Sequence, residues 1–129
     1  MMIGAAKIAD WPEITQFLSD THYFMPIDIE TLGGQWLVAK SDEGDLLGTI
    51  WFFAQPPHLF VDFWSASGPC AAGELGVRLE QFMRKHKIRY VHGMIACENT
   101  PAMRLATQGL GMIASGPYNR VYKEVHNGV

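Results

Sequence analysis

The stretch SASGPCAAGELGVRLEQFM, residues 65–83, joins a strand-like apolar segment to a helical pattern through a run of small residues. Apolar residues recur at helical spacing from Leu75 onward and predict a helix over Leu75–Lys85 that begins near Glu74. Small residues ahead of a helix let backbone N–H groups approach an anion, and the helix N-terminus favours negative charge. The stretch therefore indicates either an anion-binding loop or a tight turn, and the acidic Glu74 argues against the first.

The composition limits the classes of protein to which the chain can belong. It has 129 residues, of which 48% are hydrophobic and 18% charged, as expected for one folded domain over residues 1–129. The net charge of −3 and the lack of a basic patch argue against nucleic-acid binding. No apolar run approaches the roughly 20 residues of a membrane span, and no signal peptide is recognisable, so we expect a cytoplasmic protein without membrane contact.

Strand and turn patterns lie on the N-terminal side of the opening stretch. A short strand is expected over residues 2–9, followed by a helix with Asp10 as N-cap and Glu13 completing a capping box. Strands are then expected over residues 35–40, 46–54 and 58–66. The turn residues between the first two of these, Ser41 to Asp45, predict a hairpin. Three adjacent strands with short turns indicate an antiparallel meander.

The pattern changes on the C-terminal side. A buried strand is expected over residues 90–96, then a helix over residues 99–108 capped by Asn99, and a final strand over residues 119–125. A strand, a helix and a further strand in this order favour a parallel pair. The predicted fold class is therefore α/β, a mixed sheet in which an antiparallel meander precedes a parallel strand–helix–strand unit.

This element order resembles the GNAT superfamily of N-acetyltransferases over nearly the whole chain. The segment ENTPAMRLATQGLGM, residues 98–112, looks like the family's segment from an Asn through a small residue and a Leu to a Gly, here Asn99, Ala102, Leu105 and Gly111. The resemblance implies acetyl-CoA as cofactor. It implies that the backbone of Trp64, Ser65 and Ala66 holds the pantetheine arm. It further implies that amides from Gly68 through Gly73 to Gly76 hold the pyrophosphate, and that Asn99 lines the groove.

Three positions depart from the family pattern. Ala71 occupies the place of a Gln or Arg in the family's phosphate loop, and Glu74 that of its first glycine. A carboxylate at Glu74 would repel a pyrophosphate unless it points away. Ala106 replaces the family's frequent Tyr acid. Proximity of the bound reactants would still supply much of the rate enhancement without that acid.

Two residues are candidates for the acid–base chemistry. Strand alternation places Asp62 on a face with Phe60 and Trp64, an apolar setting that suits a general base. The alternative for Asp62 is a polar residue with a water or backbone partner. Tyr122 on the final strand could replace the missing Tyr as acid, or serve only in cross-strand packing.

Other reactive side chains receive structural interpretations. His92 is expected to be a core histidine satisfied by the backbone, and His58 an exposed turn residue. The five histidines show no metal-binding spacing, so no metal site is expected. Cys70 has no base beside it in sequence and is expected to be unreactive.

Two functions remain open at this point. The first is transfer of an acetyl group from acetyl-CoA to an amine on a small molecule or peptide. The second is a catalytically inactive GNAT-fold binding or structural protein, and such degenerate domains are found among phage proteins. The aromatic residues concentrated in the meander are expected to be mostly core, and any that face away from the helices would leave a surface that suits a homodimer.

Overall fold

The structure is a computed structural model that describes residues 1–20, 32–95, 100–109 and 111–115. The chain divides into two compact units, Met1–Gly93 and Met94–Val129. Among the helices of the described ranges, none combines the length and the apolar character that crossing a bilayer requires.

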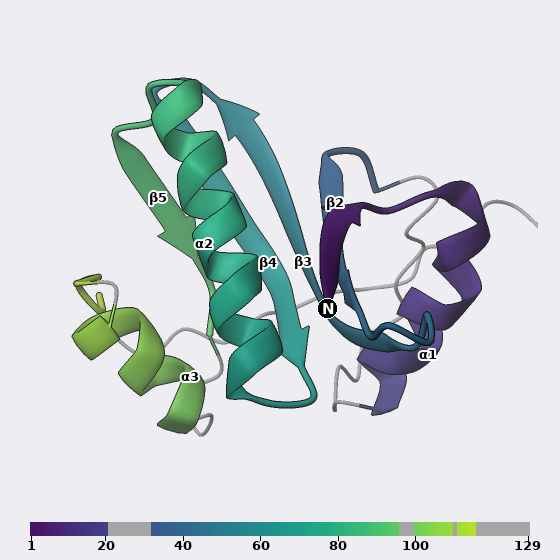
Figure 1. Ribbon diagram of the computed structural model, residues 1–129. Helices are drawn as coiled ribbons and strands as arrows, with labels where there is room; N and C mark the ends of the chain where they lie inside the picture. Colours follow the sequence, from purple (N-terminus) through teal and green to yellow (C-terminus); the bar gives the residue numbers. More distant parts are fainter. Residues whose placement is uncertain (21–31, 96–99, 110, 116–129) are drawn as a thin grey trace, which may run out of the picture. The chain divides into compact units, whose positions relative to one another are not determined.

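The N-terminal unit is built on a mixed sheet of five strands in the order β1-β2-β3-β4-β5 (Figure 1). The strands are β1 (Met2–Ala5), β2 (Gln35–Lys40), β3 (Leu46–Gln55), β4 (His58–Ala66) and β5 (Tyr90–Gly93). The first three pairings are antiparallel, and β4 pairs with β5 in parallel. The predicted α/β class, the meander and the parallel pair are confirmed.

The hairpin between β2 and β3 forms where the turn residues predict it. The Gly44 amide donates to the Ser41 carbonyl at 2.9 Å, and Ser41 in turn donates its amide to the Asp45 carbonyl at 2.9 Å. Gly44 has φ of +89°, a conformation that a residue with a side chain adopts only with strain. The turn therefore sets the register of β2 on β3.

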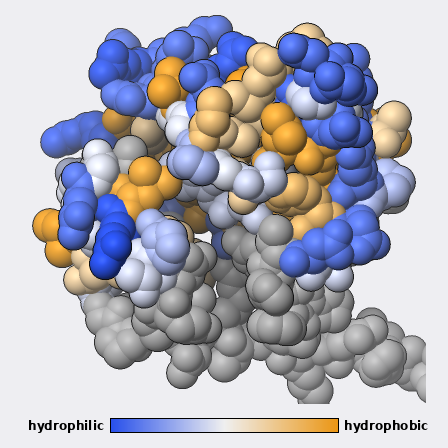
Figure 2. All heavy atoms as spheres, turned by 60° about the horizontal axis from the view of Figure 1, so that its bottom comes forward, coloured by the Kyte–Doolittle hydropathy of each residue, from blue (hydrophilic) through white to orange (hydrophobic). Residues whose placement is uncertain are grey.

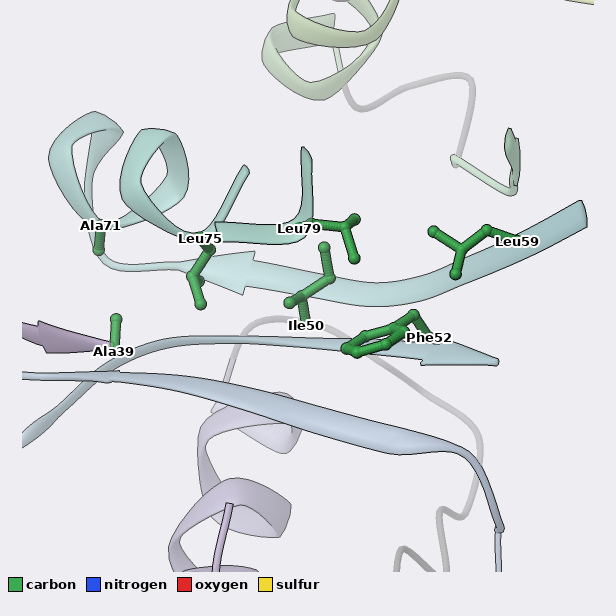
Figure 3. Packing of buried hydrophobic residues seen from close by; sticks show 7 residues of the cluster. All are labelled: Ala39, Ile50, Phe52, Leu59, Ala71, Leu75 and Leu79. Carbon is green, nitrogen blue, oxygen red and sulfur yellow. The ribbon is translucent and has the colours of Figure 1, made fainter. Parts of the chain in front are cut away.

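Helix α2 (Pro69–Lys85) covers one face of the sheet. Its buried side chains, Ala71, Leu75 and Leu79, point toward buried residues of the strands (Figure 3). Those strand residues are Ala39, Ile50, Phe52 and Leu59. The spacing of four along α2 puts its apolar residues on one stripe, and burying that stripe fixes the helix on the sheet.

The other face of the sheet carries a second core, formed with α1 (Trp11–Asp20). Ile14 and Leu18 of α1 are fully buried and pack in one cluster with Trp36, Val38 and other strand residues. Because neighbouring residues of a strand point to opposite faces, Trp36 and Val38 face α1 while Ala39 faces α2. Two layers of helix thus enclose the antiparallel part of the sheet.

The entry to α1 differs from the predicted capping box. Asp10 ends a short 3-10 turn, η1 (Ile8–Asp10), and its Oδ2 accepts the Lys7 amide at 2.8 Å. Its Oδ1 binds the Lys40 ammonium at 2.5 Å. Glu13 does not return to the cap, because its Oε1 accepts the amide of Leu46 at 3.1 Å. The two acids therefore tie the start of α1 to the β2–β3 hairpin.

A β-bulge interrupts β4 and corrects the predicted face of Asp62. The β3–β4 register shifts between Thr49 and Trp51, and Phe63 has φ of +51°. Val61 lies in the α2 core, Phe63 in the α1 core and Trp64 again in the α2 core. Simple alternation would place Phe60, Asp62 and Trp64 together. That prediction is wrong because the bulge adds one residue to β4.

Strand β5 is shorter and more exposed than predicted. It spans Tyr90–Gly93 rather than residues 90–96, and all four residues are exposed. The reason is its place at the end of the described sheet, beyond the strands whose buried residues pack against α2. The core position predicted for His92 is therefore wrong. The predicted final strand, residues 119–125, lies outside the described residues.

The C-terminal unit contains α3 (Thr100–Arg104), which continues as a wider π-helical turn, η2 (Leu105–Gly109). Pro101 is the second residue of α3, as expected for a proline in a first turn. The Met112 amide donates to the Ala106 carbonyl at 2.9 Å, and Gly111 has φ of +68°. The helix predicted over residues 99–108 is present, with a π-helical end.

Candidate functional site

The parallel ladder between β4 and β5 stops before β4 does. Its register runs from His58↔Tyr90 to Val61↔Gly93, whereas β4 continues to Ala66. On its other side, β4 stays paired with β3 as far as Gly48↔Ala66. In α/β sheets, ligands bind outside the carboxyl ends of the strands. Trp64, Ser65 and Ala66 lie on this extension of β4, where the resemblance puts the pantetheine arm.

The connection from β4 to α2 is shorter than the sequence suggests. It consists of Ser67 and Gly68, and the helix begins at Pro69. Both the amide and the hydroxyl of Ser67 donate to the Leu47 carbonyl, at 2.8 and 3.1 Å. The prediction that the helix begins near Glu74 is wrong. Proline is well suited to the first helical position because its missing N–H has no partner to lose there.

The early start of α2 changes the structural role of Gly73 and Gly76. Gly73, predicted in the loop, and Gly76, predicted at the start of the helix, both lie well inside α2, where amides bond to carbonyls one turn earlier. A Cβ built on Gly76 would lie 3.2 Å from the indole of Trp64, whereas one on Gly73 would meet nothing within 4 Å. Gly76 therefore allows α2 to approach β4 closely. The phosphate-binding roles assigned to Gly73 and Gly76 stay predictions.

The N-terminus of α2 is the part that retains the geometry of an anion site. Gly68 is the N-cap, and the Ala72 amide donates to its carbonyl at 3.2 Å. The amides of Cys70 and Ala71 precede that first intrahelical bond. A Cβ on Gly68 would meet nothing within 4 Å, so the space beside the cap is open.

Glu74 does not lie where the sequence placed it. The first turn of α2 holds no acidic residue, and Glu74 is an exposed residue of the second turn. The prediction that Glu74 lies at the start of the helix, beside a bound pyrophosphate, is therefore wrong. What remains is a longer-range repulsion through solvent, which salt screens.

Asp62 lies at the bulge, directly after the last residue of the parallel ladder. Its Oδ1 accepts the amide of Phe63 at 2.7 Å, and the residue is half-buried. This bond gives Asp62 a structural role, because it satisfies the backbone at the irregular point of β4. Its role as a general base stays a prediction.

Two histidines that the sequence assigned to structural roles meet on the sheet. Nδ1 of His58 lies 3.0 Å from Nε2 of His92, although 34 residues separate them. The Pro57 carbonyl accepts the amides of both Arg89 and Tyr90, at 2.8 and 3.0 Å, which aligns β5 with the start of β4. No sequence spacing signals this pair, since only the parallel register brings it together.

Aromatic residues near this pair are partly exposed. Phe53, Phe60 and Tyr90 expose 40%, 39% and 48% of their surface. Hydrophobic residues, coloured orange, also reach the surface between blue hydrophilic ones in the view of Figure 2. A homodimer through such a face stays a prediction.

Two of the predicted site residues fall outside the part of the chain that the structure describes. Asn99, expected to line the cofactor groove, and Tyr122, expected as acid, lie outside the described residues. Ala106, at the family's Tyr position, is buried. Across the described parts of the chain, no three side chains of the His, Cys, Asp and Glu types cluster as a metal site would require.

The chain is similar to solved structures but not to protein-family models or curated sequences. No protein-family model matches the chain. No curated protein matches it either. Solved structures, in contrast, match over most of the chain.

One similar structure is a ribosomal-protein-alanine N-acetyltransferase from Brucella melitensis biovar Abortus 2308. It is 15% identical, with a TM-score of 0.67, and the match covers 97% of this chain and 100% of the other. A GNAT-family acetyltransferase from Staphylococcus aureus Mu50 is 12% identical, with a TM-score of 0.69, over 83% of this chain and 80% of the other. A transcriptional regulator from Bacillus halodurans C-125 is 14% identical, with a TM-score of 0.72, over 95% of this chain and 99% of the other.

Identities this low carry information about the fold and not about substrates. The strand order and the parallel β4–β5 pair agree with what the sequence resemblance implied. Together with the acetyltransferase structures, they show that this chain has the fold of the GNAT superfamily.

Proposed function

We propose that this chain is an N-acetyltransferase that moves an acetyl group from acetyl-CoA to an amine of a small molecule or peptide. The observation that carries the proposal is the extension of β4 beyond β5 into a two-residue link and the N-terminus of α2. In the GNAT fold, the resemblance assigns cofactor binding to this segment.

The residues of this segment fit the cofactor chemically. Trp64, Ser65 and Ala66 offer backbone groups on an edge of β4 that β5 does not cover within the described residues. Amides at the start of α2, beside the open space at Gly68, suit a pyrophosphate because the helix dipole favours anions. The cofactor would supply an activated acyl carbon as a thioester. The chain would hold and orient it.

The acceptor amine must lose a proton for the amide to form. Asp62 is the base that the sequence predicts, directly or through water, and its position at the end of the ladder is compatible with that role. Tyr122 and Asn99 keep their predicted roles as acid and groove residue. The acceptor itself is expected to contact the first helix and residues 22–34, most of which lie outside the described residues.

The decisive experiment uses Gly68, because its φ of 179° is accessible to any residue and a side chain there meets no atom. Gly68→Asp introduces a preferred N-cap that also repels a phosphate. Gly68→Asn introduces an equally good cap without charge. We expect both variants to keep or raise the melting temperature.

Binding of coenzyme A is then measured by calorimetric titration. The native chain and Gly68→Asn should bind, whereas Gly68→Asp should lose at least tenfold in affinity at low ionic strength. Acetyl transfer to a panel of primary amines, followed by mass spectrometry of the products, tests the reaction itself. Equal binding by the two variants would place the pyrophosphate elsewhere.

A catalytically inactive GNAT-fold protein, of a binding or structural kind such as occurs in phages, is the second candidate. The observation that favours it is Ala106, a buried residue with no acid group at the family's Tyr position. If coenzyme A, at 100 times a plausible dissociation constant, does not raise the melting temperature, this candidate replaces the enzyme. A bound ligand at that excess adds about 2.7 kcal/mol of stability.

A further inference from the structure

Four rings form a compact cluster on the β4–β5 pair. His58 and Phe60 come from β4, and Tyr90 and His92 from β5, at the register positions His58↔Tyr90 and Phe60↔His92. Leu59 and Val61, which alternate with the β4 rings, pack in the α2 core. The ring cluster therefore stands on the sheet face opposite α2.

The rings lie nearly parallel and in contact. The His58 ring is 5.2 Å from that of Tyr90 with 25° between the planes, and the His92 ring is 4.9 Å from that of Phe60 with 18° between them. His58 and His92 are 5.2 Å apart between centroids. Packing of this kind restricts ring rotation, so both imidazoles are held in defined orientations.

The contact between the two imidazoles constrains where their protons lie. Nδ1 of His58 and Nε2 of His92, 3.0 Å apart, form a hydrogen bond only if one nitrogen carries a proton and the other does not. Nε2 of His92 is engaged by this bond, which leaves Nδ1 of His92 as the nitrogen directed away from the partner ring. His92 is exposed and His58 is half-buried, so the outer member is the accessible one.

Few charged groups share this environment. Just before β5, the Arg89 guanidinium lies 5.4 Å from the centroid of the Tyr90 ring. On β4, Asp62 follows Phe60 by two residues, with Oδ1 bound to the Phe63 amide. On β3, the residues paired with His58 and Phe60 are the neutral Gln55 and Phe53. Among these described neighbours, Asp62, Arg89 and Tyr90 are therefore the charged or titratable groups.

The Phe60–His92 end of the cluster lies next to the point where β5 ends and β4 continues. The pair Phe60↔His92 immediately precedes Val61↔Gly93, after which β4 continues without β5. A ligand at the carboxyl ends of β4 and β5 would thus lie one residue pair beyond His92. Imidazole is the side chain best suited to exchange protons near neutral pH.

We propose that His92 is the general base of the acetyl transfer, in place of Asp62, and that His58 is its positioning residue. This inference rests on the proposed function. Nδ1 of His92 takes a proton from the acceptor nitrogen, and Nε2–H of the resulting imidazolium donates to Nδ1 of neutral His58. The acceptor nitrogen forms the amide bond to the acyl carbon as the thioester C–S bond breaks. The electron pair of that bond leaves on sulfur, and the released proton passes to the thiolate through water.

The test measures kcat/KM against pH for the native chain and matched variants. His92→Phe keeps a ring against Phe60 but removes both nitrogens, and His92→Gln is a second variant that keeps a polar side chain. His86→Gln is the control, because His86 lies at the C-cap of α2 and contacts Phe82. We expect both His92 variants to lose 10²- to 10⁴-fold in kcat/KM together with the inflection near neutral pH. The control should keep both.

His58→Phe tests the positioning role. It should lower kcat more than it changes KM, because the protonated His92 formed during the reaction loses its acceptor. In the unliganded protein, NMR of the histidine ring nitrogens at a fixed pH should show the hydrogen bond between Nδ1 of His58 and Nε2 of His92. His58→Phe should abolish this hydrogen bond, a readout that needs no activity.

The outcomes separate the two claims. An active native chain whose His92 variants keep their rate and pH profile overturns the His92 inference and leaves the acetyltransferase intact. Loss of the inflection in Asp62→Asn, with the His92 profile unchanged, assigns the base to Asp62 instead. A native chain that binds no coenzyme A and acetylates no amine overturns both the proposed function and this inference.

Discussion

The backbone of Gly76 and the indole of Trp64 are in close contact across the α2–β4 interface, where an added Cβ would lie 3.2 Å from the ring. Gly73 lies in the same helix, one turn earlier, with open space at its Cβ position. Alanine is about 0.5–1 kcal/mol better than glycine inside a helix. The two positions therefore offer a matched pair in which helix propensity is constant and packing differs.

We expect Gly73→Ala to raise the free energy of unfolding by about 0.5–1 kcal/mol. Gly76→Ala should show no gain or a loss, because the methyl group must displace the Trp64 ring. Urea denaturation of both variants measures the difference. Equal stabilisation at the two sites would show that the indole moves aside without cost.

The ion pair of Asp10 with Lys40 makes stability depend on pH. The hydrogen bond from Lys40, and then that from the Lys7 amide, lower the pKa of Asp10 below its ordinary value. A carboxyl with a lower pKa in the folded state contributes stability above its unfolded pKa and loses it as pH falls through the folded value. We therefore expect stability to decrease on acidification below about pH 4.

Asp10→Asn should remove this part of the pH dependence and cost about 1.5–3 kcal/mol at pH 7, the range for hydrogen bonds to charged groups. Glu43→Gln, in the exposed hairpin turn, is the control for loss of one negative charge. Thermal unfolding from pH 2 to pH 7 provides the measurement. The prediction fails if both variants follow the native curve at low pH.

Leu75 is the central residue of the α2 stripe and is fully buried. Leu75→Ala should lower the free energy of unfolding by about 2.7–5 kcal/mol, since it removes buried methyl groups and leaves a cavity. Val77→Ala, on the exposed side of the same helix, should change it by less than about 0.5 kcal/mol. Chemical denaturation distinguishes the two, and similar losses would place the core elsewhere.

Glu74 offers a test of long-range repulsion at the proposed pyrophosphate site. Because Glu74 is exposed in the second turn of α2, its charge acts through water. Glu74→Gln should improve coenzyme A affinity by less than about tenfold at low salt, the range of an unscreened pair in water. The gain should vanish near 1 M salt, where the screening length is about 3 Å. A gain that persists at high salt would instead indicate a direct contact.

The local patterns predicted the sheet well because its signals are local. The bounds expected for β2 and β4 agree with the structure, and the hairpin turn is set by Gly44 with its positive φ. Strand alternation and turn residues depend only on neighbouring positions in the chain, so both signals can be read from one sequence.

Predictions failed where a longer-range contact decides the structure. The start of α2 was missed because Gly73 and Gly76 are typical of loops, whereas in the folded chain Gly76 serves packing against Trp64. The pair of His58 and His92 could not be foreseen, because it depends on the parallel register of β4 on β5. The expected face of Asp62 failed at the bulge, which no simple periodicity contains.

The bulge at Asp62 and Phe63 has a consequence for how this gene can vary. The bulge adds one residue to β4, so every side chain after it points to the opposite face from the one that simple alternation predicts. Trp64 and Ala66 therefore reach the same core as Leu59 and Val61. Loss of one codon here would exchange the two sets of side chains, turning Trp64 toward α1 and leaving Gly76 without its neighbour. Point substitutions at Asp62 change one contact. An in-frame deletion of a single residue would reassign half a strand, so alignments of related sequences should show gaps in the turns at the two ends of β4 and not within the strand.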